Sequence, residues 1–492
     1  MSDDRRPNIV MILTDDHASH SIGAYGSVVN TTPRMDEIAR RGVLFENCFA
    51  TNALCSPSRA SILTGTYSHV NGVTTLVTPI DASQPTFVSR LKAAGYRTAM
   101  VGKWHMGHGA GHDPEGFDYW DVLIGSEGQG EYWNPLFHSA EGDRVVEGYA
   151  TDIITDLATQ WVESLDGSDP WCVLIYHKAP HRPWQPKPQH ETHTDPIPLP
   201  LTFGDDYATR SASARRAAIR LAENLNREDL KQDPPEGLGY EDAAIWKYQR
   251  FMEDYLACVD SVDENVGRVI DWLTERGNFD DTLLMYASDQ GFFLGDHGWF
   301  DKRLMYEESL RMPLMLSYPR RVAAGQVHDG IVTNVDWAQT LLDAAGVEHH
   351  PRMQGRSFWG DIVGAATAPP AEGMYYRYWE NDDKFHKAPA HYGYRTDRYK
   401  LIYFYNDGLG LPGTGPFTYP PEWELYDLQT DPQELRNVYD KPSYLEVREQ
   451  LKAVMWRKQA GLRDTPHSSQ PTPVGDAGAM AQSTHDTHTD AV

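Results

Sequence analysis

Residues 7–16 read PNIVMILTDD, and this stretch decides the fold class because an apolar run, Ile9 to Leu13, stops abruptly at two aspartates. A short continuous apolar run is typical of a strand buried on both faces of a parallel sheet. Similar runs occur at Thr98 to Val101, Cys172 to Tyr176 and Thr282 to Ala287, separated by longer segments of helical periodicity. The alternation predicts an α/β fold with a large mixed, mostly parallel sheet sandwiched by helices.

The longest helical pattern runs from Ala243 to Leu273, with apolar residues at steps of three or four along one helix face. Residues 185–239 are Pro-rich and then charged without a clean period, so we expect a long surface excursion there.

The length of 492 residues indicates more than one core, and an Ala- and Pro-rich stretch near residue 370 marks a boundary. We expect a catalytic domain over residues 1–370 and a smaller α+β domain with a four-stranded antiparallel sheet over 371–462. Strands are predicted at Tyr375 to Tyr378, Tyr399 to Tyr405 and Glu424 to Leu428, with a helix near Tyr444 to Ala460. Residues 463–492 have almost no apolar content and are expected to form a disordered tail.

The net charge of -26, from 44 Lys and Arg against 70 Asp and Glu, argues against nucleic acid as a partner. An anionic substrate would need cations concentrated at one site. No stretch reaches the length of a membrane span, and the polar N-terminus lacks a signal-peptide core, so we expect a cytoplasmic protein without a membrane partner. A homo-oligomer is compatible with the sequence.

Four cysteines in so long a chain do not form a disulfide framework. Cys48, Cys172 and Cys258 fall in apolar contexts and are expected to be core thiols. Cys55 lies in a loop-like stretch, where we expect it to be partly exposed.

Each predicted strand is followed by polar residues, at the edge where ligands bind in open α/β sheets. Two ends are acidic or rich in oxygen, at Asp15-Asp16 and Asp289-Gln290. Two are basic, at Lys103-Trp104-His105 and in the segment from His177 to His181. We therefore expect one site that combines an acidic cluster with cations.

Asp15, Asp16, Asp289 and the side-chain carbonyl of Gln290 would supply hard oxygen ligands, which favours Ca²⁺ or Mg²⁺ over zinc. Calcium tolerates this irregular set better, at ligand distances of about 2.3 to 2.6 Å. An Asp-Asp pair alone is more often a turn or a helix cap, and it counts here because a second acidic strand end matches it.

Cys55-Ser56-Pro57-Ser58-Arg59 predicts the start of a short helix that ends at Gly65, since Pro favours the first turn and Gly the terminus. Free amides and the helix dipole would favour an anion beside Cys55. For an isolated motif of this kind, a small buried thiol at an ordinary helix start is the simpler interpretation.

Taken together, these residues resemble the type I sulfatases of the alkaline phosphatase superfamily, with the signature Cys-x-Pro-Ser-Arg at 55–59 and Leu-Thr-Gly at 63–65. The resemblance continues through the strand ends described above and through Gly298-Trp299-Phe300-Asp301-Lys302. It is strongest towards bacterial sugar sulfatases. Gln290 departs from the family, in which this position is often Asn.

The resemblance implies that a formylglycine-generating enzyme oxidises Cys55 to formylglycine, whose hydrate attacks sulfur and also joins Asp15, Asp16, Asp289 and Gln290 as a ligand of one Ca²⁺. Arg59, Lys103 and Lys302 would offset charge on the sulfate oxygens. His105 would contact the formylglycine, and His181 ranks first as the general acid, ahead of Lys302. Lys178 is either an extra substrate contact or a solvated lysine.

Three alternatives stay open at this point. The first is a phosphonate monoester or phosphodiester hydrolase of the same superfamily. The second is a catalytically silent sugar-sulfate binding protein with an unmodified Cys55, and the third is a thiol hydrolase that uses Cys55 and a histidine. For the sulfatase we expect a small sulfated sugar or an aryl or alkyl sulfate, selected by the 185–239 excursion, by Glu131-Tyr132-Trp133, and by His391, Tyr392 and Arg395.

Overall fold

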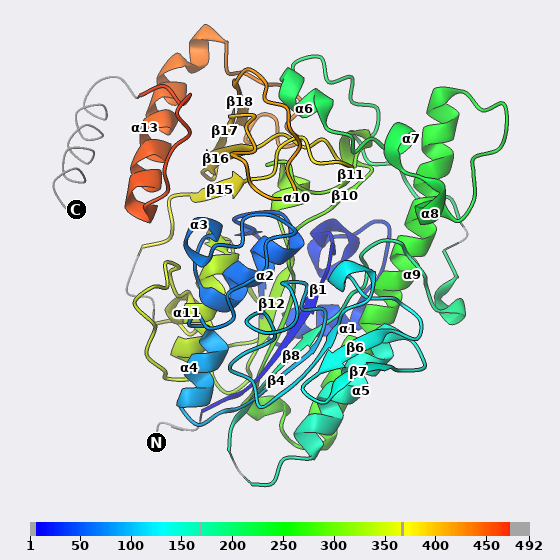
Figure 1. The fold of residues 1–492 in the computed structure, drawn as a ribbon, viewed down its shortest axis with the longest axis vertical. Helices are drawn as coiled ribbons and strands as arrows, with labels where there is room; N and C mark the ends of the chain where they lie inside the picture. Colours follow the sequence, from blue (N-terminus) through cyan, green and yellow to red (C-terminus); the bar gives the residue numbers. More distant parts are fainter. Residues whose placement is uncertain (1–5, 168, 194, 366–368, 473–492) are drawn as a thin grey trace.

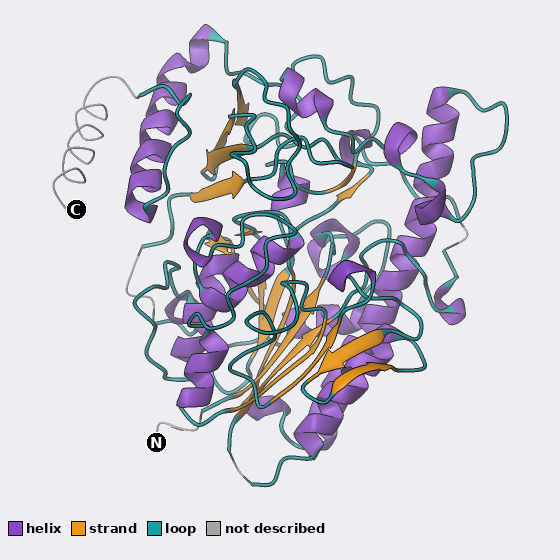
Figure 2. Cartoon of the chain, in the orientation of Figure 1, coloured by secondary structure: helices purple, strands orange, loops and turns teal. Residues whose placement is uncertain are grey.

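The structure is a computed structural model that describes residues 6–167, 169–193, 195–365 and 369–472. Within these residues, ten strands form one sheet with helices on both faces (Figure 1, Figure 2), as predicted. In spatial order they are β13 (Gln326–His328), β2 (Val43–Phe45), β12 (Leu314–Ser317), β9 (Thr282–Ser288), β1 (Asn8–Thr14), β8 (Trp171–Tyr176), β4 (Arg97–Gly102), β5 (Tyr119–Leu123), β6 (Leu136–Ser139) and β7 (Gly142–Val145). The four predicted strands are the adjacent parallel strands β9, β1, β8 and β4 at its centre.

The side chains of β1 explain its unbroken apolar sequence. Val10 and Ile12 belong to one hydrophobic layer, and Ile9, Met11 and Leu13 belong to the other. Alternate residues of a strand point to opposite faces, and here both faces are covered. All five side chains are inaccessible to solvent, so β1 holds the residues that follow it in a fixed position.

Each layer has its own set of helices. On one face lie α1 (Pro33–Arg40), α5 (Ala150–Glu163) and the predicted long helix, α9 (Tyr240–Glu275). On the other lie α2 (Cys55–Thr64) with the short α3 (Ser68–Asn71) beside it, α4 (Phe87–Ala93), α10 (Glu307–Leu310), α11 (Trp337–Ala344) and α12 (Trp359–Ile362). The excursion at 185–239 carries the short helices α6 (Ala212–Arg216), α7 (Leu221–Asn224) and α8 (Arg227–Leu230). Two small ladders pair β3 (Cys48–Phe49) with β14 (Val332–Thr333) and β10 (Phe293–Leu294) with β11 (Phe300–Asp301).

A second antiparallel sheet stands above the carboxyl edge of the large one (Figure 1). In the described part of the chain its four strands are β15 (Met374–Tyr378), β16 (His391–Arg395), β17 (Tyr399–Phe404) and β18 (Glu422–Asp427), followed by α13 (Leu445–Leu462). Three of these strands lie where we predicted strands. No residue range was predicted for β16.

The prediction of a disordered tail is wrong for residues 463–472. Asp464 is buried and pairs with Arg377, with Nη1 and Oδ1 2.6 Å apart, and Gln470 is buried against the hydroxyl of Tyr392. Low apolar content was misleading because this segment supplies polar partners to buried groups of the second sheet. Residues 473–492 lie outside the described residues.

Cys48, Cys172 and Cys258 are buried, as predicted. In the ranges that the structure describes, no helix has both the length and the apolar character needed to cross a membrane.

Candidate active site

The polar ends of the four central strands meet at one edge of the sheet. Asp289 lies next to the end of β1, because its backbone amide donates to the carbonyl of Thr14 at 3.1 Å. Lys103 lies beside the end of β8, because its amide donates to the carbonyl of Tyr176 at 2.7 Å. Asp16 has a left-handed backbone with φ of 65°, an uncommon conformation that turns the chain as it leaves β1.

Three carboxylates converge in this site without access to solvent. Oxygens of Asp15, Asp16 and Asp289 all lie within 4.8 Å of one another, and each side chain is fully buried. Burial raises the pKa of Asp16 to about 6, and the charges of Asp301 and Asp289 act in the same direction, although Lys302 opposes them. Clustered buried carboxylates of this kind need positive charge nearby.

Gln290 provides the test of whether a cation fits. Its Nε2 donates to Asp16 Oδ1 at 2.6 Å, while its Oε1 is buried and has no hydrogen-bond partner among the described residues. The oxygen and nitrogen of a side-chain amide are distinguished by their hydrogen-bond partners. With a cation among the carboxylates, the Gln290 amide would turn over so that its oxygen faces the cation. An all-oxygen set of Asp15, Asp16, Asp289 and Gln290 suits a hard divalent ion such as Ca²⁺.

Cys55 begins α2 and points at this cluster. Its Sγ lies 3.3 Å from Asp15 Oδ1, and the helix ends at Gly65 in a left-handed conformation with φ of 62°, as the sequence predicted. The thiol is only 1% exposed, so the prediction of partial exposure was wrong. Its Sγ packs against Asp15 and Gln290, and burial raises the pKa of Cys55 to about 12.

Arg59 and Lys103 lie behind the thiol, fully buried. Arg59 Nε donates to Asp289 Oδ2 at 2.9 Å. Its Nη2 lies 3.6 Å from Asp15 Oδ2 and has no hydrogen-bond partner in the described part of the chain. The Lys103 ammonium donates to Asp15 and to the side-chain oxygen of Gln129. Both cations therefore border the acidic cluster.

Lys302 pairs with a different carboxylate of the cluster. Its Nζ donates to both carboxylate oxygens of Asp16, at 2.6 and 2.7 Å, and the side chain is 2% exposed. Burial acts to lower the pKa of Lys302, but the neighbouring charges, Asp16 foremost, outweigh it and raise the pKa above its usual value. Lys302 therefore remains an ammonium ion throughout the neutral range.

The two predicted histidines differ in their surroundings. His181 Nε2 lies 3.6 Å from Asp16 Oδ2, and its Nδ1 lies 2.6 Å from the carbonyl of Arg182, which fixes the proton of the neutral ring on Nδ1. Burial and the nearby lysines hold the pKa of His181 well below its usual value. Burial and next the Lys103 ammonium do the same for the pKa of His105.

A cavity of about 470 Å³ opens over Cys55, His181 and Lys302. Ala218, Asn224, Asn226, Glu228 and Asp229 line it from the excursion, and Phe385 and His386 line it from the second sheet's loops. The excursion therefore forms part of the wall, as predicted.

Other predicted selectivity residues lie elsewhere. His391 and Tyr392 are buried in the packing of the second sheet, and Arg395 pairs with Glu307 at 2.9 Å, so none of the three lines this cavity. Tyr132 is buried and donates to the carbonyl of His181 at 2.7 Å, behind the wall. These residues stabilise the site's surroundings.

Sequence reasoning also missed Asp301, Arg303 and His386 on the cavity wall. His386 Nε2 lies 3.3 Å from Asp301 Oδ2 and 3.4 Å from Arg303 Nη2. Asp301 and Arg303 could have been found because they flank Lys302. His386 comes from a distant loop and carries no such signal.

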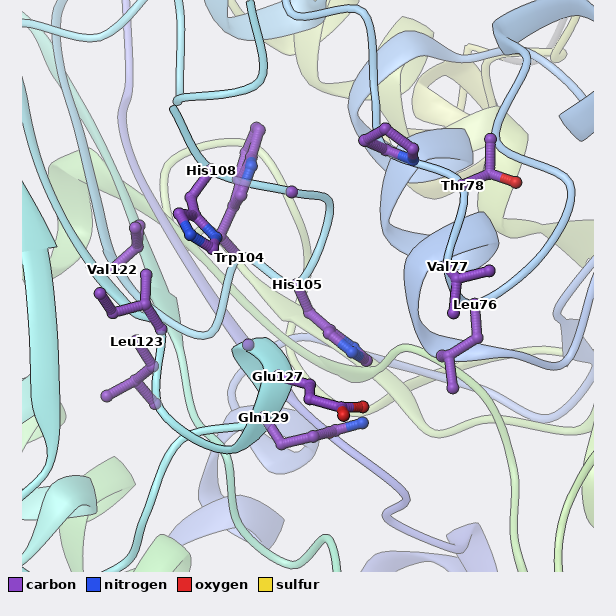
Figure 3. Close-up of a pocket in the computed structure, with 14 residues that line it drawn as sticks. Leu76, Val77, Thr78, Trp104, His105, His108, Val122, Leu123, Glu127 and Gln129 are labelled. Atoms are coloured by element: carbon purple, nitrogen blue, oxygen red, sulfur yellow. The ribbon is translucent and has the colours of Figure 1, made fainter. Parts of the chain in front are cut away.

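A second cavity, of about 350 Å³, adjoins the first and shares Leu76 and Gln129 with it. In Figure 3 the ring of His105 extends from the Trp104 segment towards Glu127 and Gln129. His105 therefore lines this second cavity, whereas Cys55, His181 and Lys302 line the first.

Comparison with known proteins agrees with this geometry. The family model Sulfatase matches residues 7–347, and the model N-sulphoglucosamine sulphohydrolase, C-terminal, matches 295–461. The chain is 40% identical over 505 residues to an N-acetylglucosamine-6-O-sulfatase of Bacteroides thetaiotaomicron, covering 94% of this chain and 87% of that protein. It is also similar, at a TM-score of 0.87 and 38% identity over 95% of this chain and 100% of the other, to a protein solved with its substrate D-glucosamine-2-N,6-O-disulfate. A phosphonate monoester hydrolase of Agrobacterium radiobacter shares the fold alone, with a TM-score of 0.72, 21% identity and coverage of 93% and 95%.

The chain therefore belongs to the sulfatase family, and it is a sulfuric ester hydrolase. Within that family it is of the bacterial sugar-sulfatase type.

Proposed function

We propose that this enzyme hydrolyses the 6-O-sulfate ester of a small glucosamine-type sugar, using formylglycine derived from Cys55 and one Ca²⁺. The observation that carries the proposal is the position of Cys55, at a helix start, 3.3 Å from Asp15, under a cavity and among buried carboxylates and cations. A buried thiol with a raised pKa is a poor nucleophile in its own right, which disfavours a metal-free thiol hydrolase.

Asp15, Asp16, Asp289, Gln290 and the residue-55 side chain would hold the calcium ion. When bound, Ca²⁺ polarises the sulfate group and offsets the charge of the three carboxylates. The hydrated aldehyde at residue 55 supplies a hydroxyl nucleophile together with a route for releasing sulfate that a serine lacks.

The protein's own cations bind and orient the sulfate. Arg59 Nη2 is buried and donates to none of the described residues, so an oxygen of an anion beside Cys55 can satisfy it. Lys302 is close enough for its charge to oppose the rise in the pKa of Cys55, which places positive charge beside the reacting atoms. These groups are fixed by burial, so they need little reorganisation when charge develops in the transition state.

His181 is neutral in this state, with Nε2 facing Asp16 and the cavity. Binding of an anionic ester next to Nε2 would raise the pKa of His181 and allow it to take up a proton. His181 would then donate that proton to the leaving sugar oxygen, as a general acid must. Lys302 holds a proton in all states and stabilises that oxygen.

The substrate class is supported by two similar proteins, the N-acetylglucosamine-6-O-sulfatase and the protein solved with D-glucosamine-2-N,6-O-disulfate. Because the cavity is lined from the excursion and from the loop of Phe385 and His386, we propose a monosaccharide or a short chain end as substrate.

The test is a substrate panel with protein matured by a formylglycine-generating enzyme. It contains N-acetylglucosamine 6-sulfate, glucosamine 6-sulfate with and without an N-sulfo group, an aryl sulfate, choline sulfate and a phosphonate monoester. We expect the highest kcat/KM for a 6-O-sulfated glucosamine, and faster release from the free sugar than from an intact polysaccharide. Higher kcat/KM for the phosphonate monoester would reverse the assignment in favour of phosphoryl chemistry.

A further inference from the structure

Lys178 is a buried cation on the wall of the active-site cavity. It lies two residues beyond the end of β8, it is 2% exposed, and it lines the cavity together with Cys55, His181 and Lys302. Moving an ammonium group out of water costs several kcal/mol unless hydrogen bonds and counter-charges replace its hydration. The interpretation of Lys178 as a solvated lysine is therefore wrong.

The hydrogen bonding of this ammonium is incomplete. Its Nζ donates to the carbonyl of Arg182 at 3.1 Å and lies 5.0 Å from the ring centroid of Tyr132. Over the described ranges, no carboxylate oxygen lies within the 4.0 Å limit of an ion pair. An ammonium has three N–H donors, so two of them have no acceptor within the residues that the structure describes. By contrast, Lys103 pairs with Asp15 and Lys302 with Asp16.

The charges around Lys178 place it near the reacting centre. After burial itself, the Lys178 ammonium is the largest influence that lowers the pKa of Lys103, and it also lowers the pKa of His181. Burial lowers the pKa of Lys178 to about 8, while the charges of Cys258, Glu131, Asp16 and Cys55 oppose this effect. Lys178 is thus within electrostatic reach of both the thiol and the acidic cluster.

We propose that Lys178 binds an oxygen of the reacting sulfate group directly, as a third lysine of the sulfate site and the one without a paired carboxylate among the described residues. The inference rests on the proposed function. Because Lys103 and Lys302 already pair with carboxylates, Lys178 gains its counter-charge only when the anion enters. Its interaction strengthens as negative charge grows on the sulfate and leaving oxygens, so it contributes to kcat as well as to binding.

The test compares Lys178→Gln and Lys178→Met with Lys178→Arg, which restores the charge. Lys178→Gln retains an amide donor for the Arg182 carbonyl, so it separates loss of charge from loss of packing. Lys187→Met is the matched control, because Lys187 is also buried and lies 5.6 Å from a tyrosine ring, but pairs with Asp152 and Glu264 away from the cavity.

Two readouts are needed. The first is calorimetric binding of inorganic sulfate to calcium-loaded protein carrying Cys55→Ala, which does not require turnover. The second is kcat/KM for N-acetylglucosamine 6-sulfate and for a small aryl sulfate with the matured enzyme. We expect Lys178→Gln and Lys178→Met to weaken sulfate binding at least tenfold and to lower kcat/KM about 10²-fold on both esters. Lys178→Arg should recover part of each loss, and Lys187→Met should change neither.

Sulfate binding and turnover by Lys178→Gln within about threefold of the parent protein would overturn the proposal. A loss confined to N-acetylglucosamine 6-sulfate, with the aryl sulfate unaffected, would also overturn it, since Lys178 would then recognise the sugar instead of the sulfate group. If the parent enzyme cleaves no sulfate ester yet Lys178→Gln abolishes binding of inorganic sulfate, the proposed function fails and the anion site stands.

Discussion

Calcium binding should depend on pH through Asp16. The pKa of this carboxyl is raised to about 6, chiefly by burial, with further contributions from Asp301 and Asp289 and an opposing one from Lys302; His181 also faces it. A carboxylate must be ionised to ligate a cation, so protons compete with calcium below about pH 6. Above that pH, Asp16 is already ionised and affinity should be constant.

The magnitude follows from the pKa. At about pH 5, one unit below it, roughly one Asp16 in eleven is ionised, and the affinity for Ca²⁺ should be about tenfold weaker than at about pH 8, or ~1.4 kcal/mol. Binding at the lower pH should release about one proton per ion, and close to none at the higher pH.

Titration calorimetry of the metal-stripped protein, in pairs of buffers with different ionisation enthalpies, measures both quantities. Asp263→Asn is the matched control, because burial raises the pKa of Asp263 to about 6 as well, yet this residue accepts hydrogen bonds from the amides of Arg34 and Met35, outside the site. The variant should show the same proton release as the parent. An affinity that stays constant from about pH 8 to about pH 5, with no proton release, would show that Asp16 does not titrate as a calcium ligand.

Three further predictions address single residues. Cys55→Ala should abolish release of sulfate, measured by ion chromatography, with an unchanged near-ultraviolet circular dichroism spectrum; turnover above trace level would contradict the assignment, and Cys55→Ser should be nearly inactive because serine cannot release sulfate. Gln290→Asn, which withdraws the amide oxygen by one methylene, should weaken calcium binding about tenfold by calorimetry, and tighter binding would show that Gln is a compromise here. Asp464→Ala should lower the free energy of unfolding by ~3 kcal/mol in denaturant titrations, because it leaves Arg377 and the Tyr375 hydroxyl buried without this partner; a loss below about 1 kcal/mol would disagree.

The sequence predicted the parts of the fold that depend on local pattern. The central strands β1, β4, β8 and β9 were recognisable because a strand buried on both faces must be apolar at every position. The long helix α9 was recognisable from its periodicity. Ligands bind where parallel strands end. The sequence alone therefore predicted that four residues that follow strands would converge: Asp15, Lys103, His181 and Asp289.

What escaped prediction depends on contacts between distant segments. Nothing in the local sequence shows that His386 reaches Asp301, or that Asp229 joins the cavity wall by pairing with Arg182 at 2.8 Å. The order of strands in the sheet and the packing of Asp464 on Arg377 are of the same kind. The burial of Cys55 was missed because the side chains that its Sγ contacts, Asp15 and Gln290, lie far away in the chain. The division into domains at residue 370 and the cytoplasmic location stay predictions.

If residue 55 acts as a formylglycine, turnover must rise in proportion to the fraction of chains that carry the aldehyde. Preparations matured to different extents can be compared by plotting kcat on N-acetylglucosamine 6-sulfate against the fraction of chains with an aldehyde at residue 55, determined by peptide mass spectrometry. We expect a straight line through the origin. Substantial turnover in a preparation whose residue 55 is entirely thiol would contradict it.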